Sequence, residues 1–553
     1  MGLAKELFEI NPEDIGDLEQ AKLIIGKLFI VIESFHQDIQ SLKKINQELK
    51  DEVNRLKGEQ GKPNIRPNVK PDARGDISSD RERKDAESGQ EGKPRHQKKR
   101  KKPKPIRTQR CRLNKDDLPS DVVFKGYERN VIAETYLHVE YVEFKRDKYY
   151  SPSLKKTYIA PLPEGYTREF SPSVQAWVIA MKHELNSTES VISRFLNDRG
   201  LEISPATVSR MLTKDLDRFH QEKTAIFQAG LRCRTFTQSD DTKARVKGQN
   251  QHAHIFCNDQ FTVFYTKPKK DRMTLLDILR MDKKREFILN AEAFELLRGW
   301  NMPEKRLLRL IPLQADRQYN EQELRAVIQS LFFDKALPPT YEKLIFEAAY
   351  IARYHQEDCL KALVCDHAPQ FKFIALFLAL CWVHEGRHYT KMQPIIAYHQ
   401  KQLATFRKQF WLFYKSLLAY QLEPTSEKAI EINSGFDALC AFKATYPELK
   451  DRIAKTKANK AELLYVLTDP SVPLHNNESE LGARKKVRDR DIRLHTMSEE
   501  GTRANDMFLT LRETARKQAV GFMAYILDRL SGSYAMTSLA DLISQNHPVV
   551  SSA

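Results

Sequence analysis

A heptad repeat of apolar residues characterises the beginning of the chain. Between residues 15 and 57, the a positions are Ile25, Ile32, Ile39, Asn46 and Val53, and the d positions are Leu28, Phe35, Leu42, Leu49 and Leu56. β-Branched residues at a with leucine at d favour two parallel helices, and one asparagine at a fixes their register. We therefore expect a homodimeric coiled coil. A single amphipathic helix packed on its own protein is the alternative.

The apolar pattern stops between residues 58 and 110. This stretch has almost no large apolar residues, so it cannot bury enough surface to fold. Its last part, residues 93–110, holds ten Lys or Arg and no acidic residue. We expect a linker that contacts DNA phosphates without reading sequence, through Lys98, Lys99, Arg100, Lys101 and Lys102. A solvated tail is the alternative.

The next segment, residues 111–170, alternates apolar and polar positions and predicts a small β-rich module. It contains one cysteine, Cys111, and none of the seven cysteines of the chain forms a C-x-x-C pair. A disulfide framework and a zinc module with four cysteine ligands are therefore not expected, and reduced thiols indicate a cytosolic protein.

Residues 186–213 have the pattern of two short helices joined by a tight turn. Asn186 begins a capping box for the first helix, and Gly200 ends that helix. Ser204 caps the second helix, which packs through Ala206, Val208 and Leu212 and presents outward Thr207, Ser209 and Arg210. Because such a second helix enters the major groove of DNA, we expect a helix-turn-helix; an ordinary helix hairpin is the alternative.

Strand periodicity begins after residue 231. We expect strands over residues 232–240, 252–257, 260–266 and 361–366. Helical periodicity dominates residues 273–360 and 390–465. The first and last of these strands run directly into Asp240 and Asp366, and an acid that follows an apolar strand commonly faces a site.

The length and the net charge of the chain limit the number of domains and the class of partner that we expect. A chain of 553 residues exceeds what one core holds, and a net charge of +16 favours a polyanionic partner. The apolar run 23–32 contains Lys27, and the run 371–383 is shorter than the roughly 20 residues of a membrane span. We expect no signal peptide and no membrane partner.

Two strand-borne aspartates and a helix-borne glutamate form a common ligand set for divalent metal ions. With Glu480 as the third member, Asp240 and Asp366 would hold two Mg²⁺ about 3.5–4 Å apart. The chain has 74 acidic residues, so two alternatives stay open. Asp240 can be a strand-end turn residue, and Glu480 can form a capping box with Asn477.

Five motifs resemble the insertion-sequence-66 family of bacterial transposases, and they occur in the family's order. They are residues 238–250 (QSDDTKARVKGQN), 363–370 (LVCDHAPQ), 381–388 (CWVHEGRH), 473–484 (PLHNNESELGAR) and 495–501 (HTMSEEG). The resemblance covers roughly residues 110–532. It implies a ribonuclease-H-like catalytic core with a DDE triad of Asp240, Asp366 and Glu480, and a helical insertion before the glutamate.

The resemblance also implies cofactors and companion residues. Mg²⁺, or Mn²⁺ in its place, would be the cofactor. Many members carry a cysteine-rich zinc module that this chain lacks, so no zinc is expected. Asp241 is the near decoy for the first aspartate, and the other residues expected to support the site are Cys381, His384, Arg387 and Asn477. DNA phosphates beside the site would contact Arg484, Lys485 and Lys486, for which a solvated face is the alternative.

Together these features predict an α+β multidomain DDE transposase that cleaves and transfers DNA strands. Its partners would be the terminal inverted repeats of the element, target DNA and a second copy of itself, in the bacterial cytoplasm at the nucleoid. The alternative is a non-enzymatic dimeric helix-turn-helix regulator. The expected domains are a coiled coil (1–57), a linker (58–110), the β-rich module (111–170), a helix-turn-helix domain (171–230), the first part of the core (231–384), the helical insertion (385–465) and the completion of the core (466–553).

Overall fold

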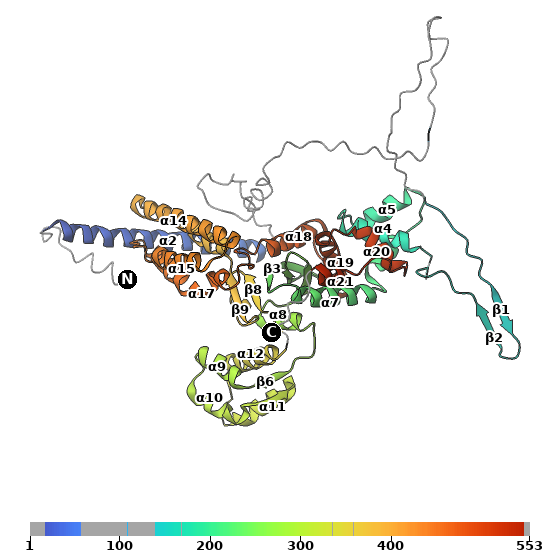
Figure 1. The fold of residues 1–553 in the computed structure, drawn as a ribbon, viewed down its shortest axis with the longest axis horizontal. Helices are drawn as coiled ribbons and strands as arrows, with labels where there is room; N and C mark the ends of the chain where they lie inside the picture. The colour runs from blue at the N-terminus through green and yellow to red at the C-terminus, as the bar shows by residue number, and fades with distance from the viewer. Residues whose placement is uncertain are drawn as a thin grey trace, which may run out of the picture.

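The computed structural model describes residues 17–56, 108, 139–166, 169–334, 336–357 and 359–546. At its centre lies a five-stranded mixed sheet with helices on both faces, which confirms the predicted combination of helices with a sheet (Figure 1). The strand order is β5-β4-β3-β8-β9. The strands are β3 (Phe236–Val246), β4 (Gln249–Cys257), β5 (Thr262–Lys267), β8 (Ala362–Cys365) and β9 (Phe377–Leu380).

The first three strands of the sheet form an antiparallel meander, whereas β8 and β9 run parallel to β3. β3 continues to Val246, so the prediction that it ends at Asp240 is wrong. Beyond Asp240 the strand pairs with β4 in a hairpin, and in this part of β3 only Ala244 and Val246 are buried, which is too few apolar positions to reveal a strand in the sequence. Lys247 and Gly248 both have positive φ (48° and 76°), as a two-residue hairpin turn requires.

Helix α19 (Glu499–Lys517) protects the edge strand β5. Asp506, Thr510 and Thr514 follow one another at four-residue intervals, which places them in one row along the helix. They accept hydrogen bonds from the outward N–H groups of Thr266, Phe264 and Thr262, at 2.6, 3.1 and 3.3 Å. An edge strand left open invites pairing with another chain, and these side chains close it.

Helix α18 (Asn477–Arg493) packs on the face of the sheet formed by Ile255, Cys257 and Phe264. The contact is close because of Gly482: a Cβ atom there would lie 2.8 Å from Cγ2 of Ile255. The opposite face is covered by α7 (Asp217–Arg232), through contacts such as Phe227 with Phe256. The C-terminal helices are α20 (Phe522–Leu530) and α21 (Leu539–Asn546).

An insertion between β5 and β8 forms the lower lobe of Figure 1. It contains a two-stranded sheet, which the helical periodicity of residues 273–360 did not predict because strands of three and five residues are too short to show a period. Its elements are α8 (Arg272–Leu279), β6 (Phe287–Leu289), α9 (Ala291–Gly299), α10 (Glu304–Leu310), η3 (Ile311–Leu313), β7 (Ala315–Tyr319), α11 (Glu321–Leu331) and α12 (Pro339–His355).

A second insertion, between β9 and α18, contains helices and no strand in the described residues 382–467. It packs around its own aromatic cluster, which includes Trp382, Phe406, Phe410, Tyr414 and Phe436. The short helix η4 (Pro369–Phe371) precedes β9. The elements of the insertion are α13 (Trp382–Lys391), α14 (Ala397–Leu422), α15 (Ser426–Cys440), α16 (Pro447–Ala458), α17 (Lys460–Leu463) and η5 (Tyr465–Leu467).

Three short helices precede the sheet: α4 (Pro172–His183), α5 (Glu189–Asn197) and α6 (Pro205–Thr213). Ser204 caps α6 as predicted, and Gly200 has φ 84° in the turn before it. The predicted cap of α5 is wrong, because Thr188 accepts the hydrogen bond from the Val191 N–H and Asn186 lies in the preceding turn with φ 54°. Ala206 is exposed, not packed.

The N-terminal helix α2 (Leu18–Leu56) contacts the second insertion through positions other than a and d, and the most buried of these residues is Glu33 at a b position. Glu33 is 2% exposed, and its Oε1 accepts hydrogen bonds from the N–H groups of Ile395 and Ile396 at 3.0 and 2.9 Å. These N–H groups lie at the start of α14, where the helix dipole favours a carboxylate. The a and d positions of α2 stay exposed, among them Ile32 at 43% and Leu42 at 64%.

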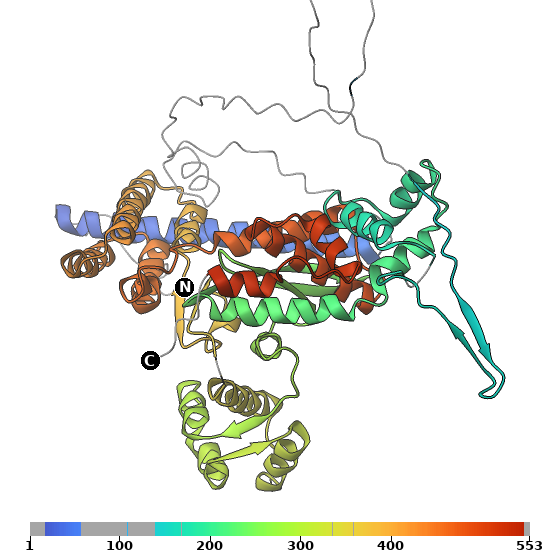
Figure 2. The same ribbon diagram turned by 45° about the vertical axis from the view of Figure 1, so that its right-hand side comes forward.

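Part of the N-terminal prediction lies outside the described residues, including Lys98, Lys99, Arg100, Lys101, Lys102 and Cys111. Within the β-rich module, the described residues 139–166 contain one hairpin, β1 (Lys148–Ser151) and β2 (Lys156–Ile159), which projects from the body (Figures 1 and 2). Among the described helices, none has both the length and the apolar composition needed to cross a membrane.

The close approach at Gly482 predicts a stability effect. Gly482→Val should force α18 away from β4 and destabilise the fold by about 1–3 kcal/mol, as overpacked substitutions do. Gly299→Ala is the control, because no atom lies within 4 Å of its added Cβ. Urea unfolding monitored by circular dichroism measures both variants. Equal midpoints for Gly482→Val and wild type would show that α18 does not pack as described.

Candidate active site

Asp240 and Asp366 lie side by side because β3 and β8 pair in parallel. Phe236 pairs with Ala362 and Gln238 with Val364, so the same register continued by two residues places Asp240 beside Asp366. The two aspartates thus share one face of the sheet, and neighbouring strands are about 4.8 Å apart. Asp240 and Asp366, which are 126 positions apart in the chain, meet through this pairing.

Glu480 approaches the same face from helix α18. Asp240 pairs across β3 and β4 with Ile255, the residue on which Gly482 packs. One turn earlier, the backbone N–H of Glu478 donates a hydrogen bond of 3.2 Å to Oε1 of Gln238, which fixes the start of α18 against β3. Glu480, 8% exposed, therefore lies in the layer between α18 and the sheet with the two aspartates.

The carboxylates of the cluster are close enough to affect one another electrostatically. Burial raises the pKa of Asp240 from 3.8 to about 7, and the negative charges of Asp366, Asp241 and Glu480 raise it further, against a hydrogen bond from the Asp241 N–H. Because the carboxylates repel one another, binding of a positive ion between them is favourable.

Arg387 on α13 holds the Glu480 carboxylate. Its Nη2 lies 3.1 and 3.2 Å from Oε1 and Oε2 of Glu480, and its Nη1 donates to Nε2 of His384 at 2.8 Å. Burial lowers the pKa of His384, and the charge of Arg387 lowers it further, so the imidazole accepts this bond in its neutral form. Arg484, one turn after Glu480, lies 3.9 Å from the same carboxylate.

Asp241 faces the other side of the sheet. Neighbouring residues of a strand point to opposite faces, and Asp241 pairs across the strands with His254 instead of Ile255. Its carboxylate is 3.6 Å from Nζ of Lys270 and accepts a 3.2 Å hydrogen bond from Gln370. The residue that is adjacent in sequence is therefore separated from the cluster in space.

The remaining support residues lie near the cluster with different roles. Cys381 is buried at the start of α13, and burial raises the pKa of its thiol to about 12, so it is protonated and not a ready metal ligand. The capping box expected as an alternative for Asn477 does not form, because Asn476 is the N-cap of α18 without a side-chain hydrogen bond. Asn476 is fully buried, and sequence reasoning did not single it out.

The donor chemistry fits a hard divalent cation, because three carboxylates supply the oxygen ligands that Mg²⁺ and Mn²⁺ prefer. Among the described residues, no three His, Cys, Asp or Glu side chains already surround a common point suited to a metal ion. Glu480 is turned toward Arg387, so a shared cation would require this side chain to exchange the guanidinium for the ion.

The residues predicted to contact DNA have different environments. On α6, Arg210 is exposed and donates to Oγ1 of Thr207 at 3.2 Å, and Ser209 is half-buried. On α18, Arg484 is exposed. The prediction that Lys486 contacts DNA at the surface is wrong. Lys486 is 7% exposed, and its ammonium pairs with Asp506. Lys485 is half-buried, and burial lowers its pKa.

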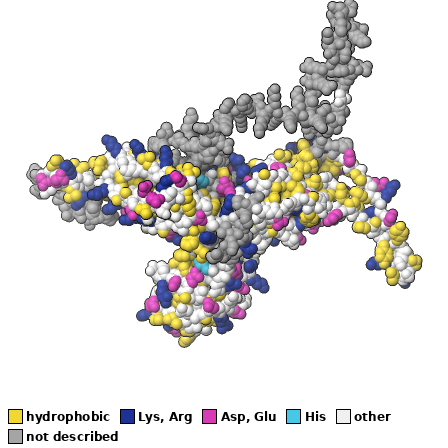
Figure 3. Space-filling view, in the orientation of Figure 1, with side chains coloured by type: hydrophobic (Ala, Val, Ile, Leu, Met, Phe, Trp, Pro, Cys, Tyr) yellow, Lys and Arg dark blue, Asp and Glu magenta, His cyan; other side chains and the backbone are white. Residues whose placement is uncertain are grey.

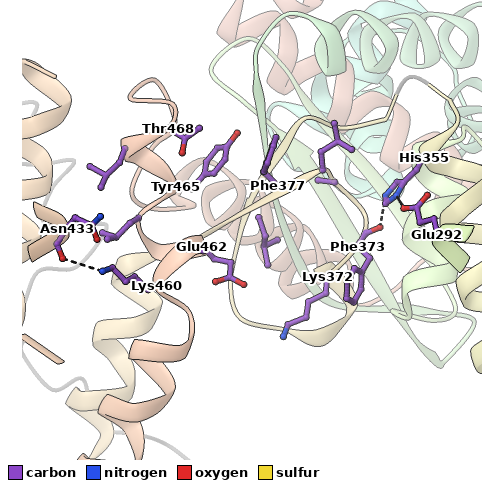
Figure 4. Close-up of a pocket in the computed structure, with 16 residues that line it drawn as sticks. Glu292, His355, Lys372, Phe373, Phe377, Asn433, Lys460, Glu462, Tyr465 and Thr468 are labelled. Carbon is purple, nitrogen blue, oxygen red and sulfur yellow. Dashed lines mark hydrogen bonds and ion pairs between the residues drawn. The ribbon is translucent and has the colours of Figure 1, made fainter. Parts of the chain in front are cut away.

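A cavity of ≈ 1090 Å³ lies elsewhere, at the outer edge of β9. Figure 4 shows residues of the lower lobe, β9 and the second insertion around it, with Phe377 beside Tyr465. None of the three carboxylates lines this cavity.

Comparisons with known proteins agree with the motifs. Residues 168–287 match the model of the transposase IS66 family. The matched range contains α5, α6 and the strand that carries Asp240. A protein of Sinorhizobium fredii (strain NBRC 101917 / NGR234), the uncharacterized protein y4jO, is 30% identical over 325 residues. The alignment covers 58% of this chain and 99% of that protein.

The raised pKa of Asp240 predicts a pH-dependent stability. The native state gains stability when Asp240 is protonated; this gain is complete below about pH 3.8 and is lost as pH rises through about 7. Asp240→Asn should therefore stabilise the metal-free protein at pH 8, on the order of 1–3 kcal/mol, and have little effect near pH 4.

Thermal unfolding in a chelator between pH 4 and 8.5 measures this difference. Asp491→Asn, on the exposed surface of α18, is the control and should show no pH-dependent gain. If Asp240→Asn is no more stable than wild type at pH 8, the carboxylates do not repel one another as described.

Proposed function

The chain belongs to the IS66 family of transposases, and we propose from this that it is a DDE-type enzyme that cleaves and transfers DNA strands at insertion-sequence ends. One observation carries the proposal: Asp240 and Asp366 share a register on parallel strands, and Glu480 lies on the same face. A mixed sheet with an antiparallel meander and two parallel strands is compatible with a ribonuclease-H-like core.

Asp240, Asp366 and Glu480 would hold Mg²⁺, with Mn²⁺ as a substitute. When bound, two such ions activate the attacking hydroxyl and stabilise the leaving oxygen of a phosphodiester. The side chains prepare this site. Asp240, with a pKa of about 7, exchanges its proton near neutral pH, and its neighbours' charges favour a cation over that proton.

Arg387 has a positioning role in this proposal. It orients the Glu480 carboxylate through hydrogen bonds to both oxygens, and it is 39% exposed, so its guanidinium can also reach a DNA phosphate once Glu480 turns to the metal. Neutral His384 accepts a hydrogen bond from the same guanidinium, which fixes its direction.

DNA would be bound at several places. The helix pair α5–α6 supports a helix-turn-helix in which Thr207, Ser209 and Arg210 read the element end. The basic linker around Lys98, Lys99, Arg100, Lys101 and Lys102 would add contacts to phosphates. Two paired protomers would supply one active site for each element end, and the exposed a and d positions of α2 support such pairing.

The first prediction from this proposal concerns catalysis. Asp240→Asn, Asp366→Asn and Glu480→Gln should each lower Mg²⁺-dependent cleavage of DNA carrying the element ends by at least about 100-fold, because each removes a metal ligand. Asp241→Asn is the matched control, since its carboxylate lies on the opposite face, and it should retain most activity.

The readout is strand cleavage and strand transfer on labelled DNA, with DNA binding measured in parallel. Loss in the three variants with binding retained supports the enzyme. A wild-type protein that binds the ends and never cuts them would favour the regulator, and equal losses in Asp241→Asn would argue against this triad.

The second prediction concerns the dimer. The double variant Leu28→Asp, Leu42→Asp places charges in the exposed d positions of α2 and should convert a dimer into a monomer. The control double variant Ser34→Asp, Ser41→Asp, at exposed c positions of the same helix, adds the same charge without this effect. Sedimentation velocity distinguishes the two masses. A wild-type protein that is monomeric with and without DNA would contradict the coiled coil.

A further inference from the structure

The β1–β2 hairpin is an element without a partner in the described chain. Figures 1 and 2 show it projecting from the same end of the molecule as α4 and α5, and no helix or strand covers it in either view. Of residues 140–159, all but Ser151 are exposed. An isolated two-stranded hairpin is at best marginally stable in water, so we expect that a binding partner covers its exposed surface.

The hairpin carries large rings on both of its faces. Register pairs Tyr149 with Tyr158 on one face, and Tyr150 with Thr157 on the other. Tyr149 is 70% exposed, Tyr158 is 45% exposed and Tyr150 is 61% exposed. Exposed aromatic residues that do not pack on their own protein are typical of a binding surface.

The charge of the hairpin identifies the class of partner. Residues 144–159 include one acid, Asp147, and five basic residues, namely Lys145, Arg146, Lys148, Lys155 and Lys156. Figure 3 shows basic and hydrophobic side chains together on this projection. A polyanion complements the charge, and its sugar and base surfaces complement the rings.

The root of the hairpin is fixed beside the helix pair. The hydroxyl of Tyr141 donates a 2.9 Å hydrogen bond to the carbonyl of Gly200, in the turn between α5 and α6. At the other end, Gly165 has φ 81°, and a Cβ there would lie 2.6 Å from the carbonyl oxygen of Leu530. The hairpin therefore extends from a defined position next to α6.

We infer that β1–β2 is a DNA-binding ribbon that lies in a groove of the duplex held by α6, where Lys148, Lys155 and Lys156 contact phosphates and the tyrosines contact the groove. The major groove, about 12 Å wide, admits a two-stranded ribbon. The inference rests on the proposed function only in taking duplex DNA as the substrate.

Fluorescence anisotropy of the full chain with element-end DNA tests the ribbon. The triple variant Lys148→Gln, Lys155→Gln, Lys156→Gln should bind about 10–100-fold more weakly near 150 mM salt, and its salt slope should fall by about 2–3, because each phosphate contact contributes about 0.9. The control replaces the exposed lysines Lys401, Lys408 and Lys415 of α14, at the opposite end of the molecule (Figure 1), and should change neither quantity.

A second variant, Tyr149→Ser with Tyr158→Ser, should weaken binding while the salt slope stays that of wild type. A photoreactive amino acid at position 150 should crosslink to DNA. Unfolding midpoints are expected to stay unchanged in every variant, because the substituted side chains are exposed.

The outcomes separate this inference from the proposed function. Affinity and slope equal to those of the α14 control, or a crosslink to a second protein copy in place of DNA, overturn the ribbon whether or not the enzyme cuts DNA. Ribbon variants that lose binding in a protein that never cleaves DNA support the ribbon and reject the transposase. A wild-type chain with no affinity for DNA rejects both.

Discussion

The parallel pairing of β3 with β8 is the interaction on which the rest of the site depends. It brings together two aspartates that the lower lobe separates in the chain, and its register decides which residues share a face. A shift by one residue would place Asp241, not Asp240, beside Asp366. The lobe between the strands closes a long loop, and the entropy of closing it grows only slowly with its length. This explains how a large insertion can coexist with a precisely registered strand pair.

The buried carboxylates of the site lower the stability of the native state, and neighbouring contacts offset this loss. Burial and like charges raise the pKa of Asp240 to about 7, so ionisation of this carboxylate near neutral pH lowers the stability of the native state. Gly482 lets α18 approach the sheet, and Arg387 neutralises Glu480. At the far edge, α19 satisfies the free N–H groups of β5 with side chains spaced one helical turn apart. Rigidity around the carboxylates thus comes from contacts that carry no chemistry of their own.

Sequence could predict the elements with strong periodicity or a clear local signal. The cap at Ser204, the turn at Gly200 and the apolar strand before Asp366 belong to this group. It could not predict the length of β3, since Ala244 and Val246 are the only apolar residues between Asp240 and the turn, and two positions do not establish a period. It also missed the docking of Glu33 on α14, because one acid at a b position looks like any solvated residue. Contacts between distant residues, such as Arg387 with Glu480, need the tertiary fold before they can be seen.

The most direct test of a metal-dependent phosphoryl transfer replaces a non-bridging oxygen of the scissile phosphate with sulfur. Sulfur is a poor ligand for Mg²⁺ and a better one for softer ions such as Mn²⁺. If Asp240, Asp366 and Glu480 hold ions that bind this phosphate, cleavage of the sulfur-substituted element end should fall sharply in Mg²⁺ and recover in Mn²⁺. Equal cleavage of the normal and substituted ends in Mg²⁺, with either sulfur stereoisomer, would contradict metal binding at the reacting phosphate.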